Sequence, residues 1–427
     1  MTEAAQPRTD VYTPKLATLV AEGYDLGRFK ADAIAGLTVA IVALPLSMAI
    51  AIASGVSPDR GLYAAIIGGF LVSALGGSRF QIGGPAGAFI VLVATTAATQ
   101  GVDGLILATF LSGLFITIAG VMRLGGLIRL IPHAVTVGFT AGISVVIFAS
   151  QLKDLFGLRL SGKEPGELVP KLMALADAAP TLSWAALALS VSVIVVIQTI
   201  KRFRPTWPSL LIAVGAAAVA ATFLHLPVET IGTRFGGIPH GLPAPHLPQL
   251  TWGRLLEVMP AALAFTLLGS IESLLSAVVA DGMTGRRHRS NMELIAQGLA
   301  NVGSAVFGGI PVTGTIARTA TNVRAGAASP ISGMLHSAYL LAFMMLAAPL
   351  AAYVPLPALA GLLAVVAWNM AEKAEIKRLL VERKGPAMVL AATFLLTIFH
   401  DLVAGIGAGC ALAVGLALWS RWKARAG

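Results

Sequence analysis

The sequence GGIPVTGTIARTATN at residues 308–322 sets a proline break in front of a short segment that carries one cationic side chain, Arg318. The sequence GGPAGAF at residues 83–89 repeats this form without the cation. Proline and glycine interrupt helices, and the segments that follow, 315–323 and 86–99, are shorter than the roughly 20 residues that cross a bilayer. We therefore expect two half-helices at membrane depth.

Long apolar runs make up most of the remaining chain. Hydrophobic residues account for 56% and charged residues for 12% of the 427 residues, against roughly 25% charged in an ordinary soluble domain. This composition excludes a soluble enzyme and predicts an all-α polytopic membrane protein. Twelve runs predict spanning helices, which with the two half-helices makes fourteen transmembrane segments; the runs cover residues 31–53, 61–75, 102–121, 130–150, 183–200, 208–226, 256–280, 293–307, 331–352, 355–370, 386–400 and 401–420.

Three prolines and one acidic residue mark an internal repeat. Glu272 lies 227 positions after Pro45, and Pro311 lies 226 positions after Pro85. This nearly constant offset divides the chain into two halves of seven segments, and the odd number predicts that the second half is inverted. Paired broken helices in inverted halves are typical of secondary transporters with a site near the midplane of the bilayer.

Alternating residues before each break predict short extended strands at 80–82 and 307–310. Non-helical backbone is tolerated in a membrane only where protein or a cavity satisfies its polar groups. We therefore expect each half-helix to be preceded by a short strand, and the two strands are in a position to pair with each other.

The formal charge of +10 follows the expected topology. Lys and Arg accumulate in cytoplasmic loops, and an N-terminus on the inside places 22 of the 30 basic residues in inner segments and seven in outer loops. Both termini are therefore expected on the cytoplasmic side of the membrane, with lipid and not nucleic acid as the partner. Arg318 belongs to neither group because it falls at membrane depth.

Arg318 lies in a polar stripe with Thr315, Thr319 and Asn322, positions that share one helical face. The N-terminus of each half-helix also presents unpaired N–H groups and about half a positive charge, which suits an anion. A polar stripe of this kind inside a helix bundle indicates a cavity that binds an anion.

Glu272 is the other ionisable residue that this reading places in the bundle, with Gly269 and Ser276 on the same face. An intramembrane carboxylate is disfavoured by roughly 2.5 kcal/mol or more and normally faces the bundle interior with a partner. Glu272 either contributes to transport or forms a structural ion pair with Arg318.

The isolated histidines carry less information. His133, His336 and His400 show no metal-like spacing and are interpreted as satisfied packing residues. Because we find neither a nucleophile with its base nor a metal cluster at membrane depth, we expect no enzyme and no metal or other cofactor.

The chain resembles the sulfate permease (SulP) family, bacterial relatives of the solute-carrier anion exchangers, over nearly its whole length. The stretches that carry the resemblance are PDRGLYAA at 58–65, GGSRFQIGGPAGAF at 76–89, LGSIESLLSAVVADG at 268–282 and GGIPVTGTIARTATN at 308–322. The resemblance implies a secondary active anion transporter with a seven-plus-seven inverted repeat. It also implies elevator movement of a core domain against a gate domain, within a homodimer.

The family's domain pattern is expected as follows: the core comprises residues 31–128 and 256–353, the gate comprises residues 129–255 and 354–421, and residues 1–30 and 422–427 are cytoplasmic ends. Members of the family usually carry a C-terminal STAS domain. Only RWKARAG follows the last predicted helix, so we expect either a naturally short member or a truncated one.

The matching motifs imply the positions of the site. The anion is expected between Ala86, Gly87 and Ala88 of the first half-helix and Ile316, Ala317 and Arg318 of the second. Gln81 and Thr315 complete the expected substrate-binding set, and Glu272 and Ser276 are expected at the position of the coupling ion.

The chain departs from the family in its substrate motifs. Eukaryotic sulfate transporters usually carry Gln and an aromatic residue where this chain has Leu46 and Ile50. The sodium-coupled bicarbonate branch has Asp and Thr in place of Glu272 and Ser276, and a hydroxyl residue in place of Ala86.

The substrate therefore stays open between sulfate, bicarbonate and a dicarboxylate such as fumarate. Proton-coupled symport is the expected mode. The alternatives are a sodium-coupled bicarbonate symporter and an uncoupled anion channel or exchanger of the same fold. A nucleobase transporter of this architecture is disfavoured, because its site does not require a cation such as Arg318 beside the substrate.

Overall fold

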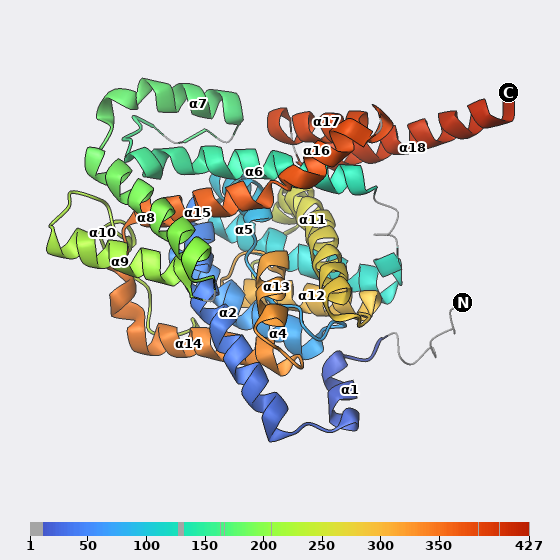
Figure 1. Cartoon of the computed structure of the whole chain (residues 1–427), viewed down its shortest axis with the longest axis horizontal. Coiled ribbons are helices and arrows are strands. Elements are labelled where there is room, and N and C mark those ends of the chain that lie inside the picture. The colour runs from blue at the N-terminus through green and yellow to red at the C-terminus, as the bar shows by residue number, and fades with distance from the viewer. Residues whose placement is uncertain are drawn as a thin grey trace.

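The computed structural model describes residues 12–126, 132–162, 164–165, 167–205, 207–382, 384–400 and 402–426. These residues form a mostly helical bundle in which helices from both halves of the chain intermingle (Figure 1). The helices are α1 (Lys15–Glu22), α2 (Leu26–Ala53), α3 (Pro58–Tyr63), α4 (Gly69–Leu75), α5 (Ile90–Val121), α6 (His133–Phe156), α7 (Leu168–Asp177), α8 (Trp184–Phe203), α9 (Ser209–Phe223), α10 (Ile231–Phe235), α11 (Trp252–Thr284), α12 (Ser290–Val306), α13 (Ile316–Arg324), α14 (Ile331–Ala351), α15 (Leu356–Met370), α16 (Lys373–Glu382), α17 (Lys384–Phe399) and α18 (Leu402–Ala426).

Each apolar segment expected from the sequence contains a helix, which confirms the helical class. Within the described residues, six helices are long and apolar enough to span a membrane: α2, α5 with the turn before it, α6, α8, α11 and α14. The boundary expected between segments 86–99 and 102–121 is also confirmed. Gly101 has φ 70° and ψ 179° inside α5, and this backbone conformation separates the half-helix from the helix that follows.

Three short helices were not expected. α7 and α10 lie in the stretches predicted as outer loops, and α16 lies between the last gate segments. The search for long apolar runs misses such helices because they are short, and α7 and α16 pack only one face. The predicted core–gate boundary between residues 128 and 129, and the last residue of the predicted tail, lie outside the described residues.

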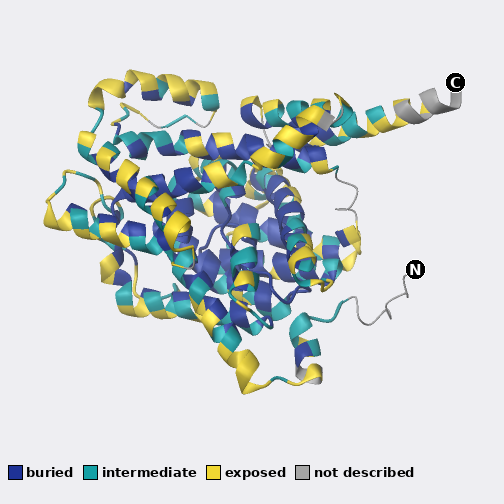
Figure 2. Ribbon diagram, in the orientation of Figure 1, coloured by how far each residue is buried: buried dark blue, intermediate teal, exposed yellow. Residues whose placement is uncertain are grey.

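Burial follows the pattern of a membrane protein. Large apolar side chains such as Leu346, Phe223 and Trp184 are exposed on the outward faces of peripheral helices. The interior of the bundle is dark blue in Figure 2, and its buried residues include charged ones such as Arg318 and Glu293. An apolar exterior around a partly polar interior is stable in lipid and not in water.

A two-stranded antiparallel sheet lies at this centre. β1 (Gly83–Gly84) pairs with β2 (Thr313–Gly314), with Gly83 opposite Gly314 and Gly84 opposite Thr313. The predicted strands at 80–82 and 307–310 are displaced, because the ladder forms a few residues further along each chain. Small residues at these positions allow the close approach, since a Cβ on Gly314 would lie 1.7 Å from Nε2 of Gln81.

Side chains satisfy the extended backbone before each strand. Nδ2 of Asn322 donates to the carbonyl of Phe80 at 2.9 Å, and the Ile82 N–H donates to Oγ1 of Thr319 at 3.1 Å. These bonds explain the displacement of the first strand, because α13 side chains and not a strand bond the Phe80 carbonyl and the Ile82 N–H.

Helix α12 gives the same support to the second strand. The Val312 N–H donates to Oδ1 of Asn301 at 2.9 Å, and Nδ2 of Asn301 donates to the Val312 carbonyl at 2.8 Å. Ser304 Oγ donates to the Ile310 carbonyl at 2.7 Å. The polar face of α12 therefore replaces a third strand.

We predict that Asn301→Leu destabilises the protein by about 1 to 3 kcal/mol, because it leaves the Val312 N–H buried without an acceptor, while the Val312 carbonyl keeps the hydrogen bond from Gln297. Thermal or denaturant unfolding in detergent measures this loss. Asn369→Leu, at an exposed position of α15, is the control and should change stability by no more than about 0.5 kcal/mol. Equal stability of the two variants would contradict the role of Asn301.

Candidate functional site

The strand pair positions two helix N-termini. After β1, Pro85 and Ala86 lead through a 3-10 turn at Gly87–Phe89 into α5, and after β2 the extended Thr315 leads directly into α13. Because the strands are antiparallel, the two helices leave the pair at opposite ends. The expected half-helices are thus fixed to each other by backbone hydrogen bonds.

The first turns of these helices provide N–H groups without helical acceptors. The first intrahelical bond of α13 runs from the Thr319 N–H to the Thr315 carbonyl at 3.0 Å. The N–H groups of Ile316, Ala317 and Arg318 precede it and have no acceptor four residues back. Such a turn carries about half a positive charge and favours an anion.

The backbone around Gly87 faces helices of the predicted gate. A Cβ on Gly87 would lie 3.1 Å from Cδ1 of Ile147 on α6 and 3.4 Å from the sulfur of Met370 on α15. In the opposite N-terminus Ile316 is half-buried and Ala317 is exposed, whereas Ala86 and Ala88 are buried. The first of the two turns therefore lies against α6 and α15 with no side chain at Gly87.

Arg318 is buried, with 1% of its surface exposed, between α2 and the strand pair. Its Nη2 donates to Oγ of Ser47 and to the carbonyl of Pro85, both at 3.2 Å. A Cβ on Gly84 would lie 2.3 Å from Nη1, so glycine at that position makes room for the guanidinium. The cation is therefore held by neutral oxygen atoms, one of them the carbonyl of Pro85 immediately before the first half-helix.

Glu272 does not pair with Arg318. Both residues are described, and the only hydrogen bonds of the Arg318 side chain go to Ser47 and Pro85. The structural ion pair that the sequence left open is therefore not formed. Glu272 lies on α11, which packs against α13, and 8% of its surface is exposed.

The hydroxyl of Ser276, one turn after Glu272, donates to Oγ1 of Thr319 at 3.1 Å. Thr313 Oγ1 donates to the carbonyl of Gly269 at 3.2 Å, one turn before Glu272. The structure thus brings the expected coupling-ion residues next to α13. It places Glu272 between a contact of α11 with α13 and a contact of α11 with β2.

Gln81 and Thr315 lie beside the strands and not in the first turns. Gln81 is buried, its Nε2 donates to Oγ of Ser273 at 2.9 Å, and its Oε1 has no partner among the described residues. Thr315 Oγ1 donates to the Ile82 carbonyl at 3.3 Å. Both side chains hold the strand pair in place.

Two residues near Arg318 were missed from the sequence. Ser47 on α2 accepts a hydrogen bond from the guanidinium, and nothing in its apolar surroundings in the sequence marks it. The interpretation of His336 as a satisfied packing residue is wrong, because neither of its ring nitrogens has a hydrogen-bond partner in the part of the chain that the structure describes. Its position in an otherwise apolar run was the available signal.

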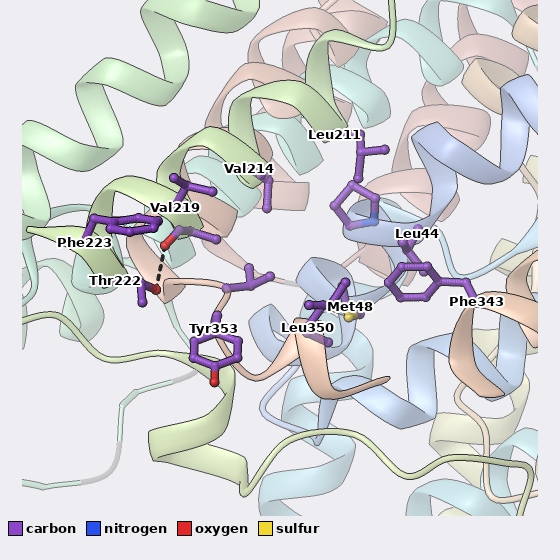
Figure 3. A pocket seen from close by; sticks show the side chains of 15 residues that line it. Leu44, Met48, Leu211, Val214, Val219, Thr222, Phe223, Phe343, Leu350 and Tyr353 are labelled. Atoms are coloured by element: carbon purple, nitrogen blue, oxygen red, sulfur yellow. Dashed lines mark hydrogen bonds between the residues drawn. The ribbon is translucent and has the colours of Figure 1, made fainter. Parts of the chain in front are cut away.

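An apolar cavity of about 400 Å³ lies elsewhere (Figure 3). Apolar side chains from α2, α9 and α14 line it, among them Met48, Val214 and Leu350. The hydroxyl of Thr222 is bonded to the carbonyl of Ala218 at 2.8 Å within α9. Because this cavity offers an anion almost no polar group, it is not the site built by the half-helices. No cluster of three potential metal ligands occurs within the described ranges.

Comparison with known proteins agrees with this architecture. The model of the sulfate permease family matches residues 29–393. YvdB of Bacillus subtilis (strain 168) is 42% identical over 399 residues, which cover 92% of this chain and 74% of YvdB. The bicarbonate transporter BicA of Picosynechococcus sp. (strain ATCC 27264 / PCC 7002 / PR-6) is 30% identical over 390 residues, covering 89% of this chain and 68% of BicA.

Solved structures show the same fold. The transmembrane domain of a cyanobacterium bicarbonate transporter BicA matches with a TM-score of 0.81 and 29% identity, over 90% of this chain and 98% of that domain. The murine anion transporter Slc26a9 in the inward-facing state matches with a TM-score of 0.86 and 19% identity, over 98% of this chain and 73% of that chain. The chain belongs to the sulfate permease family, and its relatives are transporters and not enzymes.

Proposed function

We propose that the chain is a secondary active transporter that binds a small anion between the N-termini of α13 and of the half-helix after β1. The observation that carries the proposal is Arg318, a buried cation held only by neutral oxygen atoms beside these two N-termini. Since no carboxylate neutralises it there, its charge adds to that of the helix ends and attracts an anion.

Charge at the site suggests how transport is coupled. The two N-termini contribute about +1, Arg318 contributes +1 and an ionised Glu272 contributes −1, so the empty site carries about +1. Protonation of Glu272 raises the sum to about +2, which suits sulfate or a dicarboxylate such as fumarate. We therefore propose that a proton on Glu272 accompanies the anion.

The fold supports an elevator mechanism in which fourteen segments form two inverted halves. The cavity in Figure 3 lies between α2 and α14 of the predicted core and α9 of the predicted gate. The apolar side chains that line this cavity offer few hydrogen bonds that would oppose sliding of one domain past the other. We expect the gate helices to form the interface of a homodimer in the lipid bilayer of a bacterial inner membrane.

Contacts at the end of the N-terminal helix support its placement in the cytoplasm. Arg79 before β1 forms an ion pair with Glu22, and Nη1 of Arg289 donates to the carbonyl of Thr13 at 2.8 Å. The guanidinium of Arg79 beside it holds the pKa of Glu22 below its ordinary value, so the pair is ionised at neutral pH. The N-terminal segment and two basic loops thus share one end of the bundle, as the distribution of Lys and Arg predicts.

The names of the relatives suggest the substrate class. YvdB is named as a sulfate transporter and BicA as a bicarbonate transporter. Sulfate and bicarbonate are both small oxyanions, which accept hydrogen bonds from backbone N–H groups and from an arginine such as Arg318. If sodium and not a proton is the coupling ion, bicarbonate becomes the favoured substrate. An uncoupled channel or exchanger would use the same site without ion coupling.

We predict that Arg318→Ala weakens anion binding at least 100-fold, about 2.7 kcal/mol or more, because the site loses its one side-chain cation. Titration calorimetry with sulfate, bicarbonate and fumarate measures the affinity. Arg324→Ala, in the exposed last turn of the same helix, is the matched control and should bind normally. Unchanged affinity in Arg318→Ala protein would refute the site.

We predict that Glu272→Gln abolishes the acceleration of anion uptake by an inward proton gradient, because an amide does not take up a proton at physiological pH. Uptake into proteoliposomes with and without the gradient measures the effect. Glu257→Gln, at an exposed position of the same helix, should keep the acceleration. Acceleration that persists in Glu272→Gln protein would eliminate this residue as the proton carrier, and acceleration by sodium alone would favour the sodium-coupled alternative.

We predict that Ala218→Phe slows uptake at least tenfold with little change in anion affinity, because the larger side chain fills the cavity between core and gate. Ala216→Phe is the control, since Ala216 lines a smaller cavity between α8 and α9, two helices of the predicted gate. Uptake and binding are measured on the same preparations. A normal uptake rate in Ala218→Phe protein would argue against sliding at this boundary.

A further inference from the structure

His336 is a fully buried imidazole on α14 that the proposed transport cycle does not use. Neither Nδ1 nor Nε2 has a hydrogen-bond partner among the described residues. α14 packs closely on α2, since a Cβ on Gly36 would lie 3.1 Å from the His336 nitrogen of the main chain. Buried polar atoms without partners are rare in proteins, and each requires a physical explanation.

Arg318 has the complementary property. Its Nη2 is bonded to Ser47 and Pro85, but its Nε and Nη1 are buried without a partner in the described part of the chain. The guanidinium lies near α14, because a Cβ on Gly84 would lie 2.3 Å from Nη1 of Arg318 and 3.8 Å from Cα of Ala65. Ser337, the residue after His336, donates its hydroxyl to the carbonyl of Ala65 at 3.2 Å. The unpaired N–H donors of Arg318 and the α14 turn that carries His336 therefore lie on either side of Ala65.

A hydrogen bond joins α13 to α14, because Nδ2 of Asn322 donates to Oγ of Ser332 at 2.9 Å. Arg318 lies one helical turn before Asn322 on α13, and His336 lies one turn after Ser332 on α14. Residues four positions apart share a helical face, so Arg318 and His336 belong to the two faces that this bond joins.

Nearby groups leave the imidazole without a counter-charge. On α2, Asp32 accepts hydrogen bonds from Tyr24 and from the Ser329 N–H and hydroxyl. On α4, the facing polar side chain is Ser73, which donates to the Gln81 carbonyl at 3.3 Å. A protonated imidazole would therefore be a second buried cation with no anion to balance it, so we treat the ring as neutral.

We infer that His336 is a positioning residue for Arg318: its neutral imidazole accepts a hydrogen bond from the unpaired guanidinium N–H groups through an enclosed water molecule. The site is polar on both sides, as a buried water requires. This inference rests on the proposed anion site, because it assigns His336 the task of holding Arg318 against Pro85 and Ser47. A neutral acceptor does so without cancelling the charge that attracts the anion.

The test compares variants of His336 by affinity for sulfate, bicarbonate and fumarate. His336→Phe keeps a flat ring but removes both nitrogens, and we expect about tenfold weaker binding at an unchanged unfolding temperature. His336→Gln restores an acceptor and should recover most of the affinity. His336→Glu should bind more weakly than the Phe variant, because a carboxylate would neutralise Arg318. His133→Phe, at a half-exposed position of α6, is the control.

Two outcomes would overturn the inference. Normal affinity in both His336→Phe and His336→Leu protein would exclude a positioning role, and the Leu variant answers the same question if the Phe variant does not fold. A flattened pH profile of uptake between pH 5.5 and 8 in His336→Gln protein would show that the imidazole titrates and is not a neutral acceptor.

The proposed function fails separately from this inference. Normal anion binding by Arg318→Ala protein would refute the site itself. Loss of binding in Arg318→Ala protein together with normal binding in both the Phe and Leu variants of His336 would refute only the role of His336.

Discussion

Every part of the centre of this protein depends on satisfying non-helical backbone where water is absent. Residues 80–84 and 310–314 are extended in the interior of the bundle, and an unpaired N–H or carbonyl there would cost several kcal/mol. The four-residue ladder of β1 and β2 covers only part of this backbone. Asn301 on α12 and Thr319 and Asn322 on α13 supply the remaining bonds. The polar faces of α12 and α13 thus stabilise the strands by hydrogen bonds. The strands in turn fix the positions of the two helix N-termini that follow them.

The same constraint explains how a cation is kept at membrane depth. Arg318 could have been balanced by Glu272, which lies on a helix packed against α13. The guanidinium instead turns toward Ser47 and the carbonyl of Pro85. Neutral oxygen atoms stabilise a buried cation by their dipoles and leave its net charge in place. Separation of the two charged groups is thus the feature on which the proposed anion binding by Arg318 and the proposed proton coupling by Glu272 depend.

Local sequence was sufficient wherever a single segment determines its own structure. Apolar runs gave the long helices, and Gly101 separated the half-helix from the rest of α5 as expected. The local sequence pattern was misleading where contacts with other segments determine the structure. Residues 80–82 alternate like a strand, yet side chains of α13 bond the Phe80 carbonyl and the Ile82 N–H. α16 is short and contains charged residues, so no apolar run in the sequence predicts it. For the site, motif positions identified the two helix ends, whereas Ser47 was not found because its neighbours along the chain are uniformly apolar.

The sequence by itself determined that this is a helical membrane protein with two broken segments, one buried arginine candidate and one acidic residue at depth. Composition and proline spacing are properties of single segments, and they require no knowledge of neighbours. Only the tertiary structure decided which way Arg318 points, that Glu272 does not pair with it, and that His336 lacks a partner. These facts depend on contacts between residues separated by up to 271 positions. Such contacts arise from how helices pack, and no local pattern encodes them.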